Sequence, residues 1–209
     1  MENILKIENA TLAFDDNELF SSFNLNINKG EIVCVLGESG RGKTSLLNAV
    51  LGFVLLKKGK IIVNQTELSK DTISMIRRQI AWVPQELALP SVWVEDMIKL
   101  PFKLRNNQHI TYSKDNVLSS FEELGLSADL YTRKVSEISG GQRQRIMIAV
   151  SVLLKRSLLV IDEPTSALDA ESSLRVFNYL RKFANEGHAV LSVSHDLDFS
   201  SRCDKQIYL

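Results

Sequence analysis

The sequence has little cysteine, no net charge and no long hydrophobic run. Its two cysteines, Cys34 and Cys203, are far apart in the chain and do not make a disulfide framework, so we expect a reducing compartment. Because 25 basic residues balance 25 acidic ones, the charge does not indicate a nucleic-acid partner. No basic segment followed by an apolar one opens the chain, so secretion is not expected. The longest apolar runs, residues 49–56 and 146–154, are far shorter than a bilayer span.

The composition is that of an ordinary globular protein. Hydrophobic residues make up 44% of the chain and charged residues 24%, which fits a soluble fold. At 209 residues, the chain is long enough for one domain with a sizeable insert. It shows no internal repeat, low-complexity tract or long linker.

The strongest signal is a glycine-rich loop that follows the apolar run at residues 32–36. Its glycines let the backbone wrap a phosphate with N–H groups pointing inward, and a helix starting near Lys43 adds its positive dipole end. We expect Lys43 to reach the β- and γ-phosphates of a nucleoside triphosphate and the Thr44 hydroxyl to bind Mg²⁺. The alternative is a glycine-rich turn before an ordinary helix, and the complete G-x-x-x-x-G-K-T pattern after a strand argues against it. The loop comprises Gly37, Glu38, Ser39, Gly40, Arg41, Gly42, Lys43, Thr44 and Ser45.

Strand-like runs occupy both ends of the chain. Phe23, Leu25 and Ile27 alternate with asparagines, a period of two that indicates a half-exposed strand. Together with a strand at residues 4–14, they predict an antiparallel ribbon leaning on a parallel core. Further strands are expected at residues 60–63, 80–83, 158–161, 189–193 and 206–209, and helices at 71–79 and at 171–186, the latter with Leu174, Phe177 and Leu180 facing inward.

The middle of the chain has a different pattern. From about residue 86 to residue 156, strand-like runs give way to helical spacing, and a helix is expected at 115–124 with Gly125 as its stop. The residues Ile146, Ala149, Val150 and Leu153 fall on one face of another helix. These patterns predict a mostly helical insert between two halves of an α/β core.

Four candidate functional positions directly follow strand-like runs: the loop from Gly37, Gln85, the pair Asp162-Glu163, and His195. Taken singly, Gln85 and His195 would most often be solvated loop residues. In a doubly wound sheet, however, ligands collect at the carboxyl ends of the parallel strands. Folding should therefore bring these four positions to one rim of the sheet.

The pair Asp162-Glu163 ends a strongly apolar run. An apolar strand that delivers an acid to a phosphate loop matches a residue that holds Mg²⁺, and we assign this role to Asp162. Glu163 is displaced by one residue and precedes Pro164, so it could polarise an attacking water instead. Two adjacent carboxylates are usually surface charge, but the four apolar residues before them indicate a buried strand end.

A second glycine-containing turn precedes the helix around residue 146. Ser139 and Gln142 have the spacing of a capping box, which accounts for those two residues. It does not account for Gly140 and Gly141, which are poor choices for a first helical turn. Glycines there would let the phosphate of another molecule approach the N–H groups at the helix start. Because the chain already has a phosphate loop, this turn would act on a nucleotide held by another subunit.

With these motifs in this order, the chain resembles an ATP-binding cassette (ABC) ATPase over its whole length. The loop at 37–45 is similar to the family's Walker A motif and residues 158–163 to its Walker B motif. Residues 138–142 are similar to the signature, with Ile138 where leucine is usual. The resemblance also matches Gln85 to the Q-loop glutamine, residues 166–169 with Asp169 to the D-loop, His195 to the switch histidine, and Phe14 to the aromatic residue that stacks on the base.

The resemblance implies an α/β fold with a P-loop NTPase (RecA-like) core, an N-terminal antiparallel β-subdomain and an inserted α-helical subdomain. One ABC ATPase domain would span residues 1–209, with residues 1–85 and 158–209 in the core and β-subdomain and residues 86–157 in the helical subdomain.

The resemblance also implies ATP and Mg²⁺ as ligands and a head-to-tail dimer with two ATP molecules at its interface. Each ATP would lie between the Walker A motif of one subunit and the signature of the other. Glu163 would be the general base, His195 would contact the γ-phosphate, and Thr44, Gln85 and Asp162 would surround Mg²⁺. Gln85 would also connect the site to the helical insert, whose surface would receive a separate transmembrane permease. The ATPase would then lie at the cytoplasmic face of the inner membrane.

The short length and residues 101–106 look most like small bacterial ATPases of the metal or iron export type, with lipoprotein-release and peptide-efflux ATPases as near alternatives. Soluble ABC ATPases of DNA repair carry a long coiled-coil or zinc-bearing insert, and translation-factor relatives carry two cassettes; neither feature is in this sequence. A simple P-loop kinase would leave residues 139–142 without a role. Transport is therefore the favoured function, and the transported substance is not encoded in these motifs.

Overall fold

The computed structural model describes residues 2–14, 17–38, 40–86 and 92–209, and its strands form two sheets. In the antiparallel sheet the order is β2-β1-β4-β5, and in the parallel sheet it is β6-β7-β8-β3-β9. The strands are β1 (Asn3–Phe14), β2 (Asn17–Asn28), β3 (Ile32–Leu36), β4 (Lys58–Val63), β5 (Thr66–Glu67), β6 (Ile80–Val83), β7 (Leu158–Asp162), β8 (Ala189–Val193) and β9 (Lys205–Tyr208).

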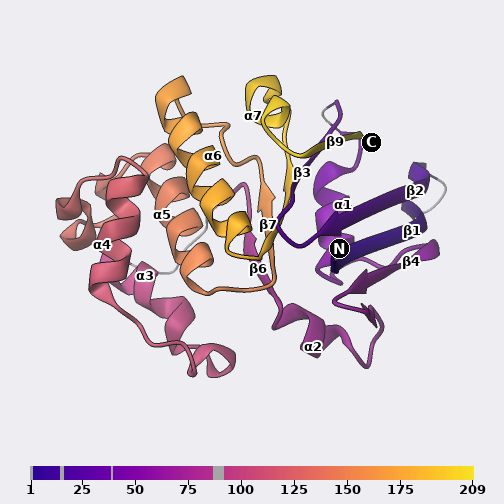
Figure 1. Ribbon diagram of the computed structural model, residues 1–209, viewed down its shortest axis with the longest axis horizontal. Coiled ribbons are helices and arrows are strands. Elements are labelled where there is room, and N and C mark those ends of the chain that lie inside the picture. The colour runs from indigo at the N-terminus through magenta and orange to yellow at the C-terminus, as the bar shows by residue number, and fades with distance from the viewer. Residues whose placement is uncertain (1, 15–16, 39, 87–91) are drawn as a thin grey trace.

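The helices lie on both sides of the parallel sheet (Figure 1). Helices α3 to α5 come between β6 and β7 in the chain and gather at one end of the molecule, while the antiparallel sheet lies at the other end. The helices are α1 (Lys43–Val50), α2 (Ile73–Arg77), α3 (Val94–Lys103), α4 (Lys114–Glu123), α5 (Gly140–Leu153), α6 (Ala170–Asn185) and α7 (Leu197–Ser201), with short 3₁₀ turns at Arg105–Asn107, Ala128–Thr132 and Val135–Glu137.

The hydrophobic patterns explain both sheets. Every residue of β3, β7 and β8 is buried, as expected for central parallel strands that are covered on both faces. In β2, by contrast, Phe23, Leu25 and Ile27 are buried while the asparagines between them face solvent, except the half-buried Asn28 at the end. The predicted half-exposed strand is therefore confirmed.

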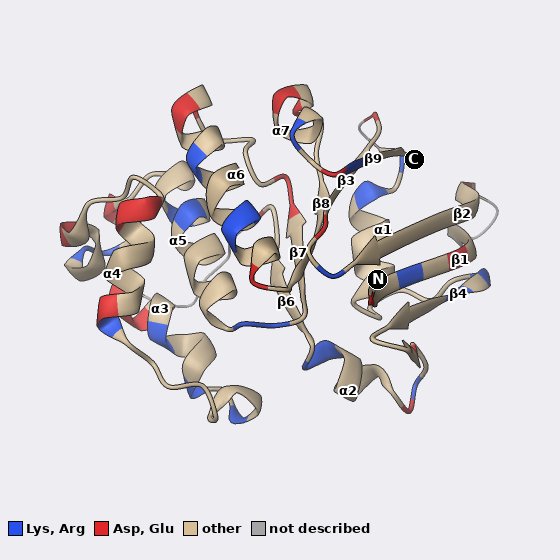
Figure 2. Ribbon diagram, viewed as in Figure 1, with Lys and Arg blue, Asp and Glu red and all other residues tan. Residues whose placement is uncertain are grey.

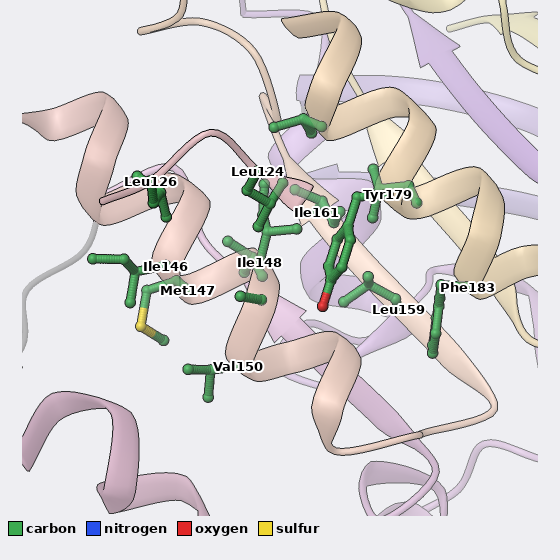
Figure 3. Packing of buried hydrophobic residues seen from close by; sticks show 14 of the residues in the cluster. Leu124, Leu126, Ile146, Met147, Ile148, Val150, Leu159, Ile161, Tyr179 and Phe183 are labelled. Carbon is green, nitrogen blue, oxygen red and sulfur yellow. The ribbon is translucent and has the colours of Figure 1, made fainter. Parts of the chain in front are cut away.

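The parallel sheet separates two hydrophobic cores. Alternate residues of β3 face opposite ways, so Cys34 joins the core on the helical side and Val35 the core beneath the antiparallel sheet. Figure 3 shows the first core, where Ile148 of α5 and Tyr179 of α6 pack near Ile161 of β7. This packing fastens the inserted helices to the sheet that carries the candidate site. Lysine, arginine and acidic residues are interspersed over the outer faces of these helices (Figure 2).

One detail of the predicted helices is wrong. Leu174 was expected to face inward but is 40% exposed, because it precedes the buried Val176 by two residues, which is about 200° around an α-helix. In helix α5 the predicted stripe residues Ile146, Ala149 and Val150 are buried, and Met147 and Ile148 are buried as well. The reason is that α5 lies in the middle of the helical side, with α3, α4 and α6 around it.

Among the described residues, none of the helices combines the length and the apolar character needed to span a membrane. Cys34 and Cys203 are both free.

Candidate functional site

The glycine-rich loop connects β3 to α1 and has the backbone that its glycines allow. Gly40 and Gly42 have φ values of 83° and 90°, in the left-handed region that favours glycine, and Gly42 is the N-cap of α1. The Lys43 ammonium group donates hydrogen bonds to the carbonyl oxygens of Gly37 (2.7 Å) and Glu38 (3.0 Å). Lys43 therefore lies folded over its own loop. Ser39, also predicted to belong to the site, lies outside the described residues.

A cavity of about 440 Å³ opens over this loop. It brings together residues from four separate parts of the chain, as the strand-end argument predicted. Leu19 of β2 also lines it, and its side chain lies so close to Gly42 that a Cβ atom on that glycine would be 3.1 Å away. The lining residues are Leu19, Gly40, Gly42, Lys43, Thr44, Ser45, Gln85, Asp162, Glu163 and His195.

Thr44 and Asp162 meet at the floor of the site. Thr44 Oγ1 donates a hydrogen bond to Asp162 Oδ2 at 2.9 Å, and Asp162 is only 4% exposed. Burial raises the pKa of the Asp162 carboxyl above its usual value, while the hydrogen bond from Thr44 acts in the opposite direction. A hydroxyl and a carboxylate are ligands that Mg²⁺ prefers, so these residues fit that ion. The exposed Gln85 lines the same cavity.

Glu163 is held in a strained backbone conformation with its carboxylate facing His195. Its φ is 52°, which is uncommon for a residue other than glycine and costs on the order of 1 kcal/mol. Carboxylate Oε2 accepts hydrogen bonds from Ser194 Oγ (3.1 Å) and from the His195 N–H (3.4 Å), and Oε1 lies 2.9 Å from His195 Nδ1. The Glu163 side chain is almost fully buried, whereas that of His195 is 68% exposed. The site thus presents a buried carboxylate and an exposed imidazole to the same cavity.

The second glycine turn has the predicted capping box. Gln142 N–H donates to Ser139 Oγ at 3.1 Å, and the Ser139 N–H donates to Gln142 Oε1 at 2.9 Å. The two glycines differ. A Cβ atom on Gly141 would lie 2.7 Å from the carbonyl oxygen of Ala167, whereas one on Gly140 would meet no described atom within 4 Å. Packing within the chain therefore explains why residue 141 is a glycine. It does not explain Gly140, whose surface is open.

Residues 139–142 do not line the cavity that the loop forms. The remaining predicted site residues also lie outside its lining. Phe14 ends β1 and is 47% exposed, and Asp169 caps α6 by accepting a hydrogen bond from the Ser172 N–H at 2.7 Å. This bond holds the pKa of the Asp169 carboxyl below its usual value. Glu38 and Arg41 form an exposed ion pair at 3.4 Å.

Sequence reasoning missed three residues around Glu163 and the loop. Leu19 carried no signal, because a leucine in an alternating strand predicts core packing. Ser194 could have been found, since it lies between the buried strand β8 and His195. Gln144 lies inside α5 and donates a hydrogen bond to the Glu163 carbonyl oxygen. A buried glutamine in a helix is not distinguishable in the sequence from an exposed one.

Comparisons with known proteins agree with this geometry. The model of the ABC transporter family matches residues 20–166, which include the loop, the second glycine turn and Asp162-Glu163. The phosphonates import ATP-binding protein PhnC of Fusobacterium nucleatum is 28% identical, and the match covers 99% of this chain and 88% of that protein. The glutamine transport ATP-binding protein GlnQ of Bacillus subtilis is 30% identical, with 98% of this chain and 85% of that protein covered.

A solved structure of an ATP-binding cassette, described as dimeric and post-hydrolysis with ADP and Pi bound, is also similar. Its TM-score is 0.83 at 27% identity, with 99% of this chain and 94% of that chain covered. The predicted fold class, a P-loop α/β core with an antiparallel β-subdomain and inserted helices, is confirmed. The chain therefore belongs to the ABC transporter family and is an ATP-binding ATPase.

Proposed function

We propose that this chain is the ATP-hydrolysing subunit that powers an ABC transporter, and that two copies close head-to-tail around two ATP molecules. The observation that carries the proposal is the position of residues 139–142. They form a capped helix N-terminus whose Gly140 is open, but they are not part of the cavity over the chain's own phosphate loop. A second copy facing the first would place this turn on the γ-phosphate side of its partner's nucleotide. The similar cassette described as dimeric supports this arrangement.

Within one subunit, we assign roles from position in the cavity. Lys43 exchanges its two loop carbonyl acceptors for the β- and γ-phosphates. Thr44, Gln85 and Asp162 hold Mg²⁺, which when bound neutralises phosphate charge. The remaining loop residues, Gly37 to Ser45 with Ser39 among them, surround the phosphates, and Phe14 stacks on the base.

Glu163 is the proposed general base. Its carboxylate is buried, faces the cavity and accepts hydrogen bonds from Ser194 and from the His195 backbone, so it is held ready to take a proton from water. His195 contacts Glu163 through Nδ1 and is the proposed ligand of the γ-phosphate. Asp169, beside the second glycine turn, belongs to the subunit interface, together with the partner-facing Ser139, Gly140, Gly141 and Gln142.

The proposed membrane partner is a separate permease, which would hold the ATPase at the cytoplasmic face of the inner membrane. An exposed aromatic cluster near Gln85 supports a protein partner. The rings of Phe53 and Trp82 are 5.6 Å apart, the Arg77 guanidinium lies 4.5 Å from the Phe53 ring centre, and Phe53 is 54% exposed. Trp82 lies in β6, three residues before Gln85, so this surface adjoins the segment that carries Gln85. We further propose residues 86–157 as the helical unit and residues 1–85 and 158–209 as the core.

The transported substance depends mainly on the permease. The names of the two similar proteins above mention phosphonates import and glutamine transport. They give no support to the narrower expectation of metal or iron export. Neither do they favour lipoprotein release or peptide efflux.

Mixing two inactive variants tests the shared sites. Ser139→Arg blocks the second glycine turn and Lys43→Ala the phosphate loop, so each variant alone should hydrolyse little ATP. A mixed dimer contains one site assembled from an intact loop and an intact turn, and the mixture should recover part of the activity. If both variants fold and form dimers but no mixture hydrolyses ATP, the sites are not shared.

A pulldown from detergent extract tests the proposed permease. Recovery of a membrane protein with the tagged chain is expected, and recovery of ribosomes or nucleic acid alone would contradict the proposal.

A further inference from the structure

Gln144 is a buried polar residue that joins the inserted helices to Glu163. It lies in the second turn of α5 and is only 5% exposed. Its side-chain amide donates a hydrogen bond to the backbone carbonyl oxygen of Glu163, and the Ser166 hydroxyl approaches the same oxygen at 3.4 Å. A buried amide that lost this partner would be costly, so the contact specifies how α5 sits against the end of β7.

The contact is made to the backbone of Glu163, which has a strained conformation. Glu163 has the left-handed φ of 52°, a conformation that persists only where the surroundings hold it. Its N–H group donates to the Val193 carbonyl oxygen at 2.9 Å, and its carbonyl oxygen accepts from Gln144. Both peptide groups that flank the Glu163 side chain are thereby fixed, the first by β8 and the second by α5.

Fixing these peptide groups also fixes where the carboxylate points. Ser194 Oγ and the His195 N–H hold Oε2 from the β8 side of the site. If the carbonyl oxygen of Glu163 were released, the backbone could leave its strained conformation and the carboxylate would turn away from these donors. Proton transfer depends steeply on such geometry, and a displacement of about 1 Å can lower a rate roughly 100-fold.

Helix α5 carries both the second glycine turn and Gln144. Residues 139–142 form the start of α5, and Gln144 follows Gln142 by two residues. A rigid helix moves as a unit over this distance, so a shift of the glycine turn also shifts the amide of Gln144. One end of α5 thus faces the proposed second subunit while its next turn holds the backbone of Glu163.

We propose that Gln144 is a positioning residue for ATP hydrolysis, which holds the Glu163 backbone and ties it to the position of α5. This proposal rests on the proposed role of Glu163 as the base. Gln144 is buried and does not line the cavity, and it acts through the orientation of the Glu163 carboxylate.

Gln144→Met tests the proposal because methionine has a similar length and no donor group. We expect kcat for ATP hydrolysis to fall by about tenfold or more, while the Kd for ATP and nucleotide-driven dimer formation stay unchanged. Gln144→Asn keeps the amide but is one methylene too short to reach, so it should lower kcat as well. The matched control is Tyr179→Phe, which removes another buried hydrogen bond, from Tyr179 to Ser120 Oγ at 2.8 Å, in which Glu163 takes no part. It should lower the melting temperature and leave kcat unchanged.

A double-mutant cycle with Glu163→Gln separates positioning from general loss of stability. Once the carboxylate is gone, Gln144→Met should have no further effect on the residual hydrolysis. A full wild-type kcat in Gln144→Met and Gln144→Asn would overturn the proposal, and so would losses that multiply in the double variant. If Glu163→Gln by itself hydrolyses ATP at the wild-type rate, it is the assignment of Glu163 as base that fails.

Discussion

Thr44 Oγ1 donates a hydrogen bond to Asp162 Oδ2 across 2.9 Å, although 118 positions separate the two residues in the chain. The contact joins the first turn of α1 to the carboxyl end of β7, so the phosphate loop and the acid share one edge of the sheet. Asp162 is buried there, and burial raises the pKa of its carboxyl. The ionised carboxylate is therefore unfavourable in the nucleotide-free chain. We expect it to lower the free energy of unfolding relative to a neutral side chain at this position.

Asp162→Asn should stabilise the nucleotide-free protein at neutral pH. For an acid whose pKa is raised on folding, the folded state binds more protons than the unfolded state, so stability falls as the pH rises through that range. The melting temperature of the variant should exceed that of the wild type by about 2 to 4 °C for each kcal/mol gained, and the difference should close at acidic pH. Calorimetric scans across acidic and neutral pH measure this. A variant that melts below the wild type at neutral pH would show that the carboxylate is not under strain.

Glu163→Gln should keep ATP binding, lower hydrolysis by about 100-fold or more, and accumulate a nucleotide-bound dimer, because the amide cannot accept a proton from water. Steady-state hydrolysis and size-exclusion chromatography with ATP measure the two effects. Glu31→Gln is a matched control, since Glu31 is half-buried and paired with Lys205 but precedes β3, away from the cavity. Undiminished hydrolysis in Glu163→Gln would remove the residue from the role of base.

Lys43→Ala should weaken ATP binding by roughly 10- to 100-fold, the effect of losing a hydrogen bond from a charged group. The ammonium group at present binds the carbonyl oxygens of Gly37 and Glu38, so its removal frees two acceptors without leaving a buried charge. Isothermal titration calorimetry with ATP gives the affinity. The exposed Lys57 serves as the control, because Lys57→Ala removes the same charge outside the cavity lining. Equal affinities for the wild type and Lys43→Ala would rule out the phosphate role.

Gly140→Ala and Gly141→Ala should separate packing from function. A methyl group on Gly141 would collide with the Ala167 carbonyl oxygen at 2.7 Å, so this variant should lose about 1 to 3 kcal/mol of stability. A methyl group on Gly140 meets no described atom within 4 Å, and alanine favours a helix over glycine, so that variant should melt at or slightly above the wild-type temperature. It should nevertheless hydrolyse ATP more slowly, because the methyl group would crowd a phosphate held by the second copy. Full activity in Gly140→Ala would show that no ligand approaches this turn closely.

The strands of the core were predictable from the alternation of their apolar residues or from short continuous apolar runs. The alternation of Phe23, Leu25 and Ile27 indicates a strand with one buried face, and the apolar run before Asp162 indicates a buried strand; both are observed. The prediction for Leu174 is wrong because the buried face of α6 includes Val176 and Phe183 as well as Phe177 and Leu180, and Leu174 lies outside that face. Periodicity within one helix does not reveal which side the neighbouring sheet lies on.

The order of motifs along the chain was sufficient to identify an ABC ATPase: a loop for phosphate, an acid after a buried strand, and a second helix start with glycines. Local residue types decide these features, because backbone freedom, helix capping and strand burial depend on near neighbours. Only the tertiary structure decided that Gln144 supports the backbone of Glu163, that Leu19 lies against Gly42, and that Gly141 but not Gly140 is required by packing. Those contacts join residues from different elements, and their existence depends on how the helices and sheets pack together.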